Sequence, residues 1–259
     1  MLGAIFGDVV GSRFEWNNIK SKNFELLVSR CEPTDDSVMT CAVAESILSG
    51  EDPVAVMQRW GRDYPGYGYG SNFVGWIYSS APAPYNSWGN GSGMRTSPVG
   101  WLFGSLEETL AAAEKYSAVT HNHPEGIKGA QAVSAAIYLA RTGSSKEQIA
   151  AYLRENFYAL DFTLDEIRPS YGFDVSCQGS VPQALQAFLE STDFEDAIRN
   201  AISIGGDSDT IAAMTGAVAE AFYGIPDELI DRLLPFVDER MMDVVRRFGR
   251  RTGLYPRLQ

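Results

Sequence analysis

Two short acidic stretches, far apart in the sequence, carry the side chains best suited to chemistry. They are Thr34-Asp35-Asp36 and Asp207-Ser208-Asp209-Thr210, and each stands just before an expected helix. Helix capping is one explanation, because Asp, Ser and Thr are favoured N-cap residues. A cap needs only one such residue, however, and adjacent carboxylates repel each other unless a cation offsets the repulsion. We therefore favour metal binding over capping alone.

The ligand types indicate which metals would bind. Carboxylates and hydroxyls are hard oxygen donors, which suit Mg²⁺ or Mn²⁺. Zinc is disfavoured because the chain has two histidines and no closely paired cysteines. Two acidic stretches are enough for two ions, which lie about 3.5–4 Å apart in two-metal hydrolytic sites. Gly205-Gly206 permits the sharp turn needed to aim Asp207, Asp209 and Thr210 at one point.

Composition narrows the class of protein. The net charge of −12 disfavours a nucleic-acid backbone as partner, since both would be negative. No apolar run is long enough to cross a membrane. Three widely spaced cysteines fit reduced thiols, so we expect a soluble, cytoplasmic protein. No linker or low-complexity tract divides the 259 residues, and we expect a single domain over 1–259.

The elements that must position the acidic stretches are helices. Apolar residues three or four apart predict a first helix over 2–10, with Gly3, Gly7 and Gly11 along one stripe where another backbone can approach closely. A second helix is expected from Asp36 to Gly50. Helical periodicity also covers 126–141, 180–190 and 210–223. Period-two runs are lacking, so the fold class is all-α.

Three further helix starts carry a capping-box pattern. These are Ser105 with Glu108, Ser144 with Glu147, and Thr192 with Glu195. The last periodic segment ends at Gly224, with Pro226 just beyond. These signatures predict where helices begin and end without reference to the rest of the chain.

The stretch from Tyr64 to Gly104 differs from the rest because it is rich in Gly, Pro, Ser, Asn and aromatic residues. A segment of this length inside a domain is usually functional or disordered. Its many aromatics argue against disorder. They are Tyr67, Tyr69, Trp76, Tyr78, Tyr85, Trp88 and Trp101. We expect an ordered surface that binds a ligand.

Five motifs in order resemble the ADP-ribosylglycohydrolase family, the group related to dinitrogenase reductase-activating glycohydrolase. They are Gly7-Asp8 with Glu15, Thr34-Asp35-Asp36-Ser37, Asn90-Gly91-Ser92-Gly93-Met94-Arg95, Thr120-His121-Asn122-His123-Pro124, and Gly205-Gly206-Asp207-Ser208-Asp209-Thr210. Ser180-Val181-Pro182 and the segment ending at Gly224 also fit the family pattern. The resemblance covers about residues 3 to 226.

The resemblance implies an all-α orthogonal helical bundle with a site for two Mg²⁺ or Mn²⁺ ions. By position, the metal ligands would be Thr34, Asp35, Asp36, Asp207, Asp209 and Thr210. Glu15 would be a mobile acid near the reacting ribose, and Glu15 or a metal-ligating aspartate such as Asp35 would activate water. The ligand-binding residues would be Ser87, Trp88, Gly89, Asn90, Gly91, Ser92 and Met94 around the pyrophosphate, together with His121.

Other residues have competing explanations. Asp8 is expected to orient ligands rather than bind metal. Arg95 either pairs with phosphate or anchors its loop, and we favour anchoring. Tyr85 and Trp88 are core aromatics or stack on adenine. A cysteine nucleophile at Cys177 is disfavoured, because nothing sets this thiol apart.

The implied activity is hydrolysis of an ADP-ribosyl bond in a modified protein, nucleic acid or small molecule. Two alternatives remain open at this point. One is a Mg²⁺-dependent nucleotide pyrophosphohydrolase, and the other is a catalytically silent protein that binds ADP-ribose. Loop 161–178, which contains Tyr171 and Phe173, is expected to select the leaving group.

Overall fold

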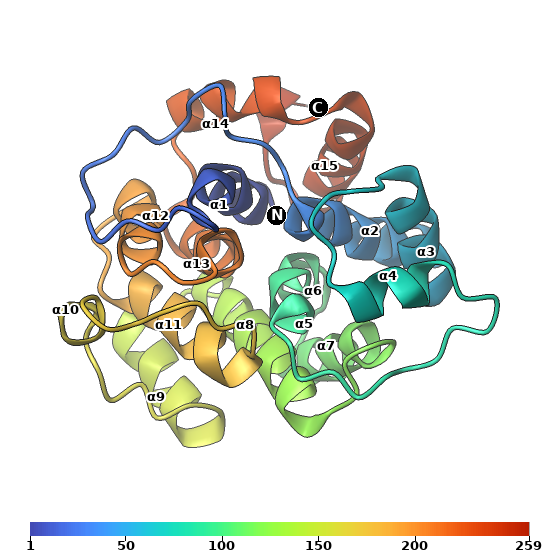
Figure 1. Ribbon diagram of the computed structural model, residues 1–259, viewed down its shortest axis with the longest axis horizontal. Helices are drawn as coiled ribbons and strands as arrows, with labels where there is room; N and C mark the ends of the chain where they lie inside the picture. Colours follow the sequence, from blue (N-terminus) through green and yellow to red (C-terminus); the bar gives the residue numbers. More distant parts are fainter. Residues whose placement is uncertain (259) are drawn as a thin grey trace.

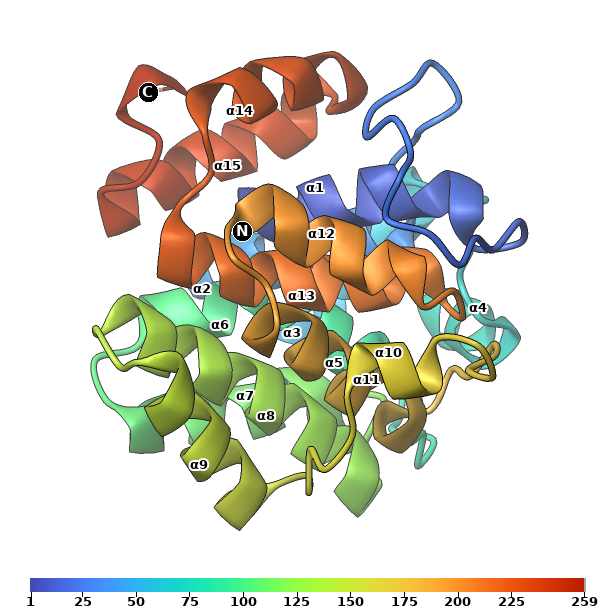
Figure 2. The same cartoon turned by 90° about the vertical axis from the view of Figure 1, so that its left-hand side faces the viewer.

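Helix α13 is the centre of the fold, and the other helices are arranged around it (Figures 1 and 2). The computed structural model describes residues 1–258. The α-helices are α1 (Leu2–Gly11), α2 (Asp35–Ser49), α3 (Pro53–Asp63), α4 (Ser71–Ile77), α5 (Gly91–Met94), α6 (Ser97–Leu102), α7 (Leu106–Ala118), α8 (Pro124–Arg141), α9 (Lys146–Asn156), α10 (Leu164–Ile167), α11 (Cys177–Leu189), α12 (Phe194–Ser203), α13 (Ser208–Tyr223), α14 (Asp227–Leu233) and α15 (Glu239–Thr252). Short 3₁₀ turns are η1 (Ser12–Phe14), η2 (Leu234–Phe236) and η3 (Pro256–Leu258).

The all-α expectation is confirmed. Residues 1–258 form no β-strand, and the one extended pairing among them is an isolated bridge between Gly89 and Ser176. No helix in the same range is long and apolar enough to span a membrane.

Two helices are buried on every side. All residues from Ser208 to Glu220 of α13 are buried, as are all ten residues of α1. A helix surrounded in this way must be apolar or small all round, and both sequences consist mainly of Ala, Gly, Ile, Val, Met and Thr. Their burial makes any polar side chain they carry a buried one, which matters for Asp8 and Asp209.

The glycine stripe of α1 lies directly against α13, as its spacing predicts. A Cβ built on Gly3 would lie 2.2 Å from the Gly216 carbonyl oxygen, and one on Gly7 would lie 2.0 Å from that of Ala212. A Cβ on Gly11 would lie 2.4 Å from the Asp209 Cα. Such contacts are far too short, so only glycine allows the two backbones to cross this closely. The crossing brings α1 to the start of α13.

Most predicted helix ends are confirmed. Thr34 caps α2 by accepting a hydrogen bond from the Asp36 amide, and Gly50 ends α2 with a left-handed φ of 76°. Ser105 and Glu108 form the predicted capping box of α7. Gly224, with a φ of 74°, follows α13.

Two predicted caps are wrong by one residue. The Ser144 amide donates to Leu139 O and so completes the turn after α8, which leaves Ser145 and Gln148 to form the capping box of α9. Asp193, rather than Thr192, caps α12. In both places neighbouring residues are equally good caps, and packing of the helix face selects between them.

The stretch from Tyr64 to Gly104 is ordered, as expected, and contains the short helices α4, α5 and α6. Several of its aromatics are structural. Tyr64 stacks on Trp60 with ring centroids 5.3 Å apart, and Trp76 stacks on Phe73 at 5.4 Å. The backbone between these helices runs along one side of the cleft described below.

The close crossing of α1 and α13 predicts that an added methyl group at Gly7 destabilises the fold. Gly7→Ala is expected to lower the free energy of unfolding by about 1–3 kcal/mol, because the added methyl group meets the Ala212 backbone. Urea denaturation measures the change. Gly75→Ala is the matched control, since that helical position has nothing within 4 Å of an added Cβ and should be neutral or slightly stabilising. Equal stability of both variants would contradict the close crossing.

Candidate functional site

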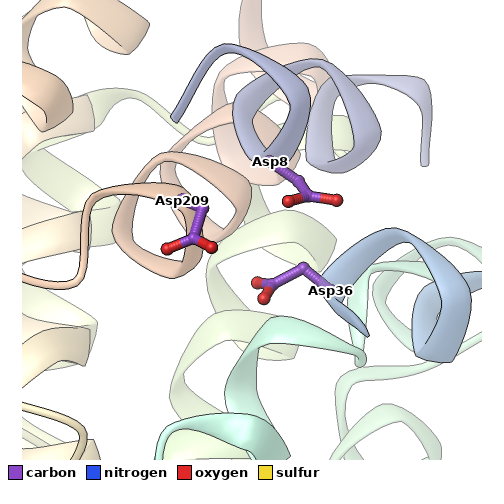
Figure 3. Close-up of side chains that lie close together, drawn as sticks. All are labelled: Asp8, Asp36 and Asp209. Carbon is purple, nitrogen blue, oxygen red and sulfur yellow. The ribbon is translucent and has the colours of Figure 1, made fainter. Parts of the chain in front are cut away.

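The two acidic stretches meet in space (Figure 3). Asp36 at the start of α2 and Asp209 at the start of α13 point toward each other, and Asp8 from α1 points between them. Carboxylate oxygens of these three residues all lie within 4.8 Å of one another. Glu15, Asp207 and Asp209 form a second such group. Asp209 belongs to both groups, so the two acidic groups form one continuous site.

Asp8 holds the start of α2 in place. Its Oδ2 accepts hydrogen bonds from the backbone N–H groups of Thr34 and Ser37, at 2.9 and 3.0 Å, and from the Ser37 hydroxyl. Its Oδ1 accepts from the Thr34 hydroxyl at 2.7 Å. Asp8 therefore positions the Thr34-Asp35-Asp36 stretch, in line with the orienting role expected for it.

Side chains also join the two stretches to each other and to the Asn90 loop. The Thr210 hydroxyl donates to Asp36 Oδ2 at 3.1 Å, across 174 residues of sequence. The Asn90 side-chain amide donates to Asp207 Oδ2 at 2.6 Å and to the Ser180 hydroxyl at 3.0 Å. Sequence reasoning placed Asn90 with the ligand, and the structure shows that its amide is directed at the acidic site.

Burial raises the pKa of every carboxyl group at the site, and neighbouring site carboxylates raise it further at Glu15, Asp35, Asp36 and Asp209. Burial, followed by the charges of Asp8 and Asp207, raises the pKa of Asp35 to about 8. Burial raises the pKa of Asp8 to about 6. The pKa values of Asp36 and Asp209 lie well above the usual range, again through burial first and neighbouring carboxylates second. This concentration of negative charge is unfavourable for the protein by itself.

Three observations indicate that the acidic site suits a cation. Asp36 Oδ1 and Asp209 Oδ1 are buried and have no hydrogen-bond partner among the described residues. Over the same residues, no lysine or arginine forms an ion pair with Asp36, Asp207 or Asp209. All the donors are hard oxygens, as Mg²⁺ and Mn²⁺ prefer. A divalent ion would satisfy the free oxygens and offset the repulsion.

The acidic site forms the floor of a cleft of about 510 Å³, which is within the size range of small-molecule binding sites. Its walls come from segments far apart in the sequence. The lining residues are Glu15, Trp16, Asp35, Asp36, Met39, Gly68, Gly70, Ser71, Asn72, Phe73, Tyr85, Ser87, Gly89, Asn90, Gly91, Met94, Arg95, His121, Phe173, Val175, Asp207, Asp209 and Thr210.

Most residues predicted for the site line this cleft. Three do not, namely Thr34, Trp88 and Ser92. Thr34 lies just behind the acidic site, bonded to Asp8. Ser92 is buried, and its hydroxyl donates to Gly126 O at 2.7 Å. Trp88 is 52% exposed, and its ring meets that of His123 with centroids 5.5 Å apart.

His121 and Arg95 line the cleft next to the Gly89–Gly91 turn. His121 is buried and packs under the Gly89–Gly91 turn, where a Cβ on Gly91 would lie 3.2 Å from His121 Nε2. Burial lowers the pKa of His121 well below its usual range, so the ring is neutral near pH 7. Arg95 donates to the carbonyl oxygens of Tyr116 and Ser117, which confirms that it anchors its loop.

Cys177 is structural. It is buried, its thiol donates to Gly89 O, and burial raises its pKa to about 12. A thiol with this pKa holds almost no thiolate at neutral pH, which argues against the cysteine nucleophile.

The structure also places residues in the cleft that sequence reasoning missed. Trp16 and Phe73 line it without having been predicted. Loop 161–178, which was predicted to contribute, lines it through Phe173 and Val175, whereas Tyr171 does not line it. Trp16 is 80% exposed and stacks on Phe173 with ring centroids 5.0 Å apart. Its position directly after Glu15 was the one available sequence signal, since a lone tryptophan in an irregular segment has no periodic pattern.

Comparison with known proteins identifies the class of protein to which this chain belongs. The family model described as ADP-ribosylglycohydrolase matches residues 1–256. The chain belongs to the ADP-ribosylglycohydrolase family and is a glycohydrolase enzyme. The resemblance seen in the motifs and the fold expected from it are confirmed.

Named relatives agree with this assignment. The ADP-ribosylhydrolase ARH3 of Homo sapiens is 26% identical over 306 residues, which cover 87% of this chain and 84% of the relative. The ADP-ribosylarginine hydrolase Tri1 of Pseudomonas putida (strain GB-1) is 26% identical over 90% of this chain and 72% of the relative. A solved "ADP-ribosylglycohydrolase-related protein complex" superposes with a TM-score of 0.73 at 24% identity, covering 97% of this chain and 95% of the solved one. That likeness supports the fold.

The raised pKa values predict how stability depends on pH in the metal-free protein. Unfolded aspartates lose their proton near the usual pKa of 3.8, whereas folded Asp8 and Asp35 keep theirs up to about 6 and about 8. The free energy of unfolding should therefore fall as pH rises from about 4 to about 8, because the unfolded state binds fewer protons there. Thermal unfolding in a chelator measures this, and stability that rises over this range would contradict it.

Divalent cations should restore the free energy of unfolding that the metal-free protein loses as the pH rises. At a hundred times its dissociation constant, a cation adds about 2.7 kcal/mol of stability, or roughly 5–10 °C in Tm. Asp209→Asn removes one shared carboxylate, so we expect the variant to gain nothing from Mg²⁺ or Mn²⁺ and, in chelator at pH 8, to be more stable than the natural protein. The same cation-induced shift in both proteins would place the cation elsewhere.

Proposed function

We propose that this protein hydrolyses an ADP-ribosyl bond and releases ADP-ribose, with two Mg²⁺ or Mn²⁺ ions held by Thr34, Asp35, Asp36, Asp207, Asp209 and Thr210. We also propose that residues 1–259 act as one domain. The observation that carries the proposal is the convergence of the two acidic stretches in the floor of the cleft, with unpartnered Asp36 and Asp209 oxygens. The names of the relatives, each an ADP-ribosylhydrolase, support the choice of bond.

The ligand-binding wall suits the ADP-ribose portion. The turn at Gly89, Asn90 and Gly91 lines the cleft without bulky side chains, so a phosphate group can approach it closely. The Gly89 and Asn90 amides already donate to Ser87 Oγ and Val175 O, which leaves the Gly91 amide as the candidate donor to phosphate. His121 beneath the turn is neutral and adds no charge. Tyr85 lines the same side, and its ring is suited to stacking on adenine. Trp88 lies at the edge, where its half-exposed ring remains a candidate for the same contact.

Glu15 is suited to moving a proton. Burial, followed by the charge of Asp207, raises the pKa of Glu15 to about 7, so both protonation states are populated near neutral pH. A group with that pKa acts efficiently as a general acid or base. Divalent cations, when bound, would polarise ribose oxygens and lower the pKa of a water molecule.

The aspartates that would hold the metal ions would also stabilise positive charge that develops during the reaction. Glycosidic cleavage develops positive charge at the anomeric carbon. Carboxylates already fixed by the fold stabilise that charge without having to reorganise. Asp35 and Asp36 are held at the start of α2, and Asp207 and Asp209 at the start of α13. Carboxylate oxygens that face the sugar would thus favour the transition state.

Asp35→Ala tests the activity directly. We expect it to lower the rate of ADP-ribose release by more than roughly 100-fold and to weaken the response to Mg²⁺ and Mn²⁺ together, because Asp35 would hold metal. The assay uses a panel of ADP-ribosylated substrates with and without each cation, and chromatography identifies the product. Glu155→Ala, an exposed carboxylate on α9, is the control and should stay fully active.

Three results would contradict the proposal. Release of AMP in place of ADP-ribose would indicate a pyrophosphohydrolase. Binding of ADP-ribose without turnover of any substrate would indicate a silent binding protein. Full activity of Asp35→Ala in chelator would exclude the metal site.

The Trp16–Phe173 pair suggests where the leaving group lies. The two rings are exposed at the rim of the cleft, beside Glu15. We expect Phe173→Ala to lower kcat/KM by about 10-fold for a peptide-linked substrate, because an aromatic contact is lost. For an acetyl-ester substrate, whose leaving group is too small to reach the rings, kcat/KM should change little. Tyr78→Ala, exposed but outside the cleft, is the control. An equal loss for both substrates would refute the assignment.

A further inference from the structure

The Glu15 carboxyl group lies where neighbouring carboxylates repel it. One of its carboxylate oxygens is within 4.8 Å of oxygens of Asp207 and Asp209, so like charges are gathered at one point. Asp209 is fixed by the buried helix α13, whereas Glu15 stands after the short turn η1, in a segment without helix up to α2. Repulsion would displace the less constrained partner first. Glu15 can therefore stay near Asp207 and Asp209 only if other contacts hold its segment.

The Asn18 side chain bridges the Glu15 segment to the turn that carries Asp207. Its Oδ1 accepts from the Gly206 amide at 2.7 Å, and its Nδ2 donates to Gly206 O at 2.9 Å. The same Nδ2 donates to the carbonyl oxygens of Phe14 at 2.7 Å and Glu15 at 3.0 Å. One amide thus joins the backbone at Glu15 to the backbone of the residue before Asp207.

Only a side-chain amide can make this set of bonds. It presents a donor and an acceptor in one plane, which match the N–H and C=O of a single residue. Gly206 offers both groups because it adopts a left-handed φ of 80°, where a β-carbon would be strained and would also meet the Tyr171 ring at 2.3 Å. The geometry at Gly206 and the amide at Asn18 therefore depend on each other.

Two neighbouring side chains also tie the Glu15 segment to other parts of the chain, Lys20 to the Gly205-Gly206 turn and loop 161–178, and Trp16 to the same loop. The Lys20 ammonium donates to Ile204 O, just before the Gly205-Gly206 turn, and to Tyr171 O at 2.6 Å. Trp16 stacks on Phe173. Of these three side chains, Asn18 is the one that donates a hydrogen bond to the backbone of Glu15, so it holds that backbone directly.

We propose that Asn18 is a positioning residue that holds the Glu15 carboxyl over the Asp207 and Asp209 carboxylates. This inference rests on the proposed function, in which Glu15 transfers a proton. Loss of the bridge would let Glu15 move outward, and displacement of a catalytic group by about 1 Å can slow a reaction up to about 100-fold. Substrate binding would change little, because Asn18 does not line the cleft.

A double-mutant cycle tests whether Asn18 acts through Glu15. Asn18→Ala should lower kcat for ADP-ribose release by roughly 10- to 100-fold and leave KM nearly unchanged. In a Glu15→Gln background, where there is no carboxyl group to position, the same substitution should lower kcat by less than about 2-fold. Asn17→Ala is the matched control, because that neighbouring side chain makes no hydrogen bond within residues 1–258.

A second measurement does not depend on activity. Hydrogen–deuterium exchange at residues 12–20 and 204–208 should be faster in Asn18→Ala than in the natural protein and in Asn17→Ala, because the bridge protects the Gly206 amide. The outcomes separate the two proposals. A natural protein that releases no ADP-ribose defeats the proposed function. Unchanged exchange in Asn18→Ala, or an equal loss of kcat in both Glu15 backgrounds, overturns the role of Asn18.

Discussion

Repulsion among buried carboxylates is the constraint on which the site depends. Asp8, Asp36 and Asp209 place oxygens within 4.8 Å of one another in the interior of the molecule, where no lysine or arginine of residues 1–258 pairs with Asp36 or Asp209. Such an arrangement opposes folding unless the rest of the structure enforces it. The same unpartnered oxygens would hold the cations that we propose, and bound cations would offset the repulsion.

The enforcing elements are helices that cannot separate. Three glycines bring α1 so close to α13 that no β-carbon fits between them, and this fixes Asp8 beside the start of α13. Asp8 then uses both its oxygens to hold the start of α2 through Thr34 and Ser37. The Asp8 carboxylate thus positions the stretch that carries Asp36, another carboxylate of the site. Backbone packing and hydrogen bonding together place Asp36 opposite Asp209 (Figure 3).

The two sides of the cleft differ in a way that suits a bipolar ligand. The acidic site carries the carboxylates, whereas the adjoining Gly89–Gly91 turn, over a neutral His121, carries none. A phosphate group at the turn would therefore avoid the carboxylates. The sugar would then lie between the turn and the acidic site, and the leaving group would face the exposed pair Trp16 and Phe173. Charge separation across the cleft thereby orients the substrate that we propose.

The sequence by itself determined the fold class, the family, the acidic stretches and the helices that carry them, whereas helices such as α3 and α15 were not predicted. Caps, glycine stops and apolar periodicity act within a few residues, so they can be read locally, although the caps at Ser145 and Asp193 were misplaced by one residue because adjacent residues cap equally well. Tertiary structure decided which distant groups meet. The Asn18–Gly206 bridge spans 188 residues, and Trp88 packs against His123 and does not line the cleft. Neither contact could be predicted from a local sequence pattern, because each joins residues that become neighbours only in the folded protein.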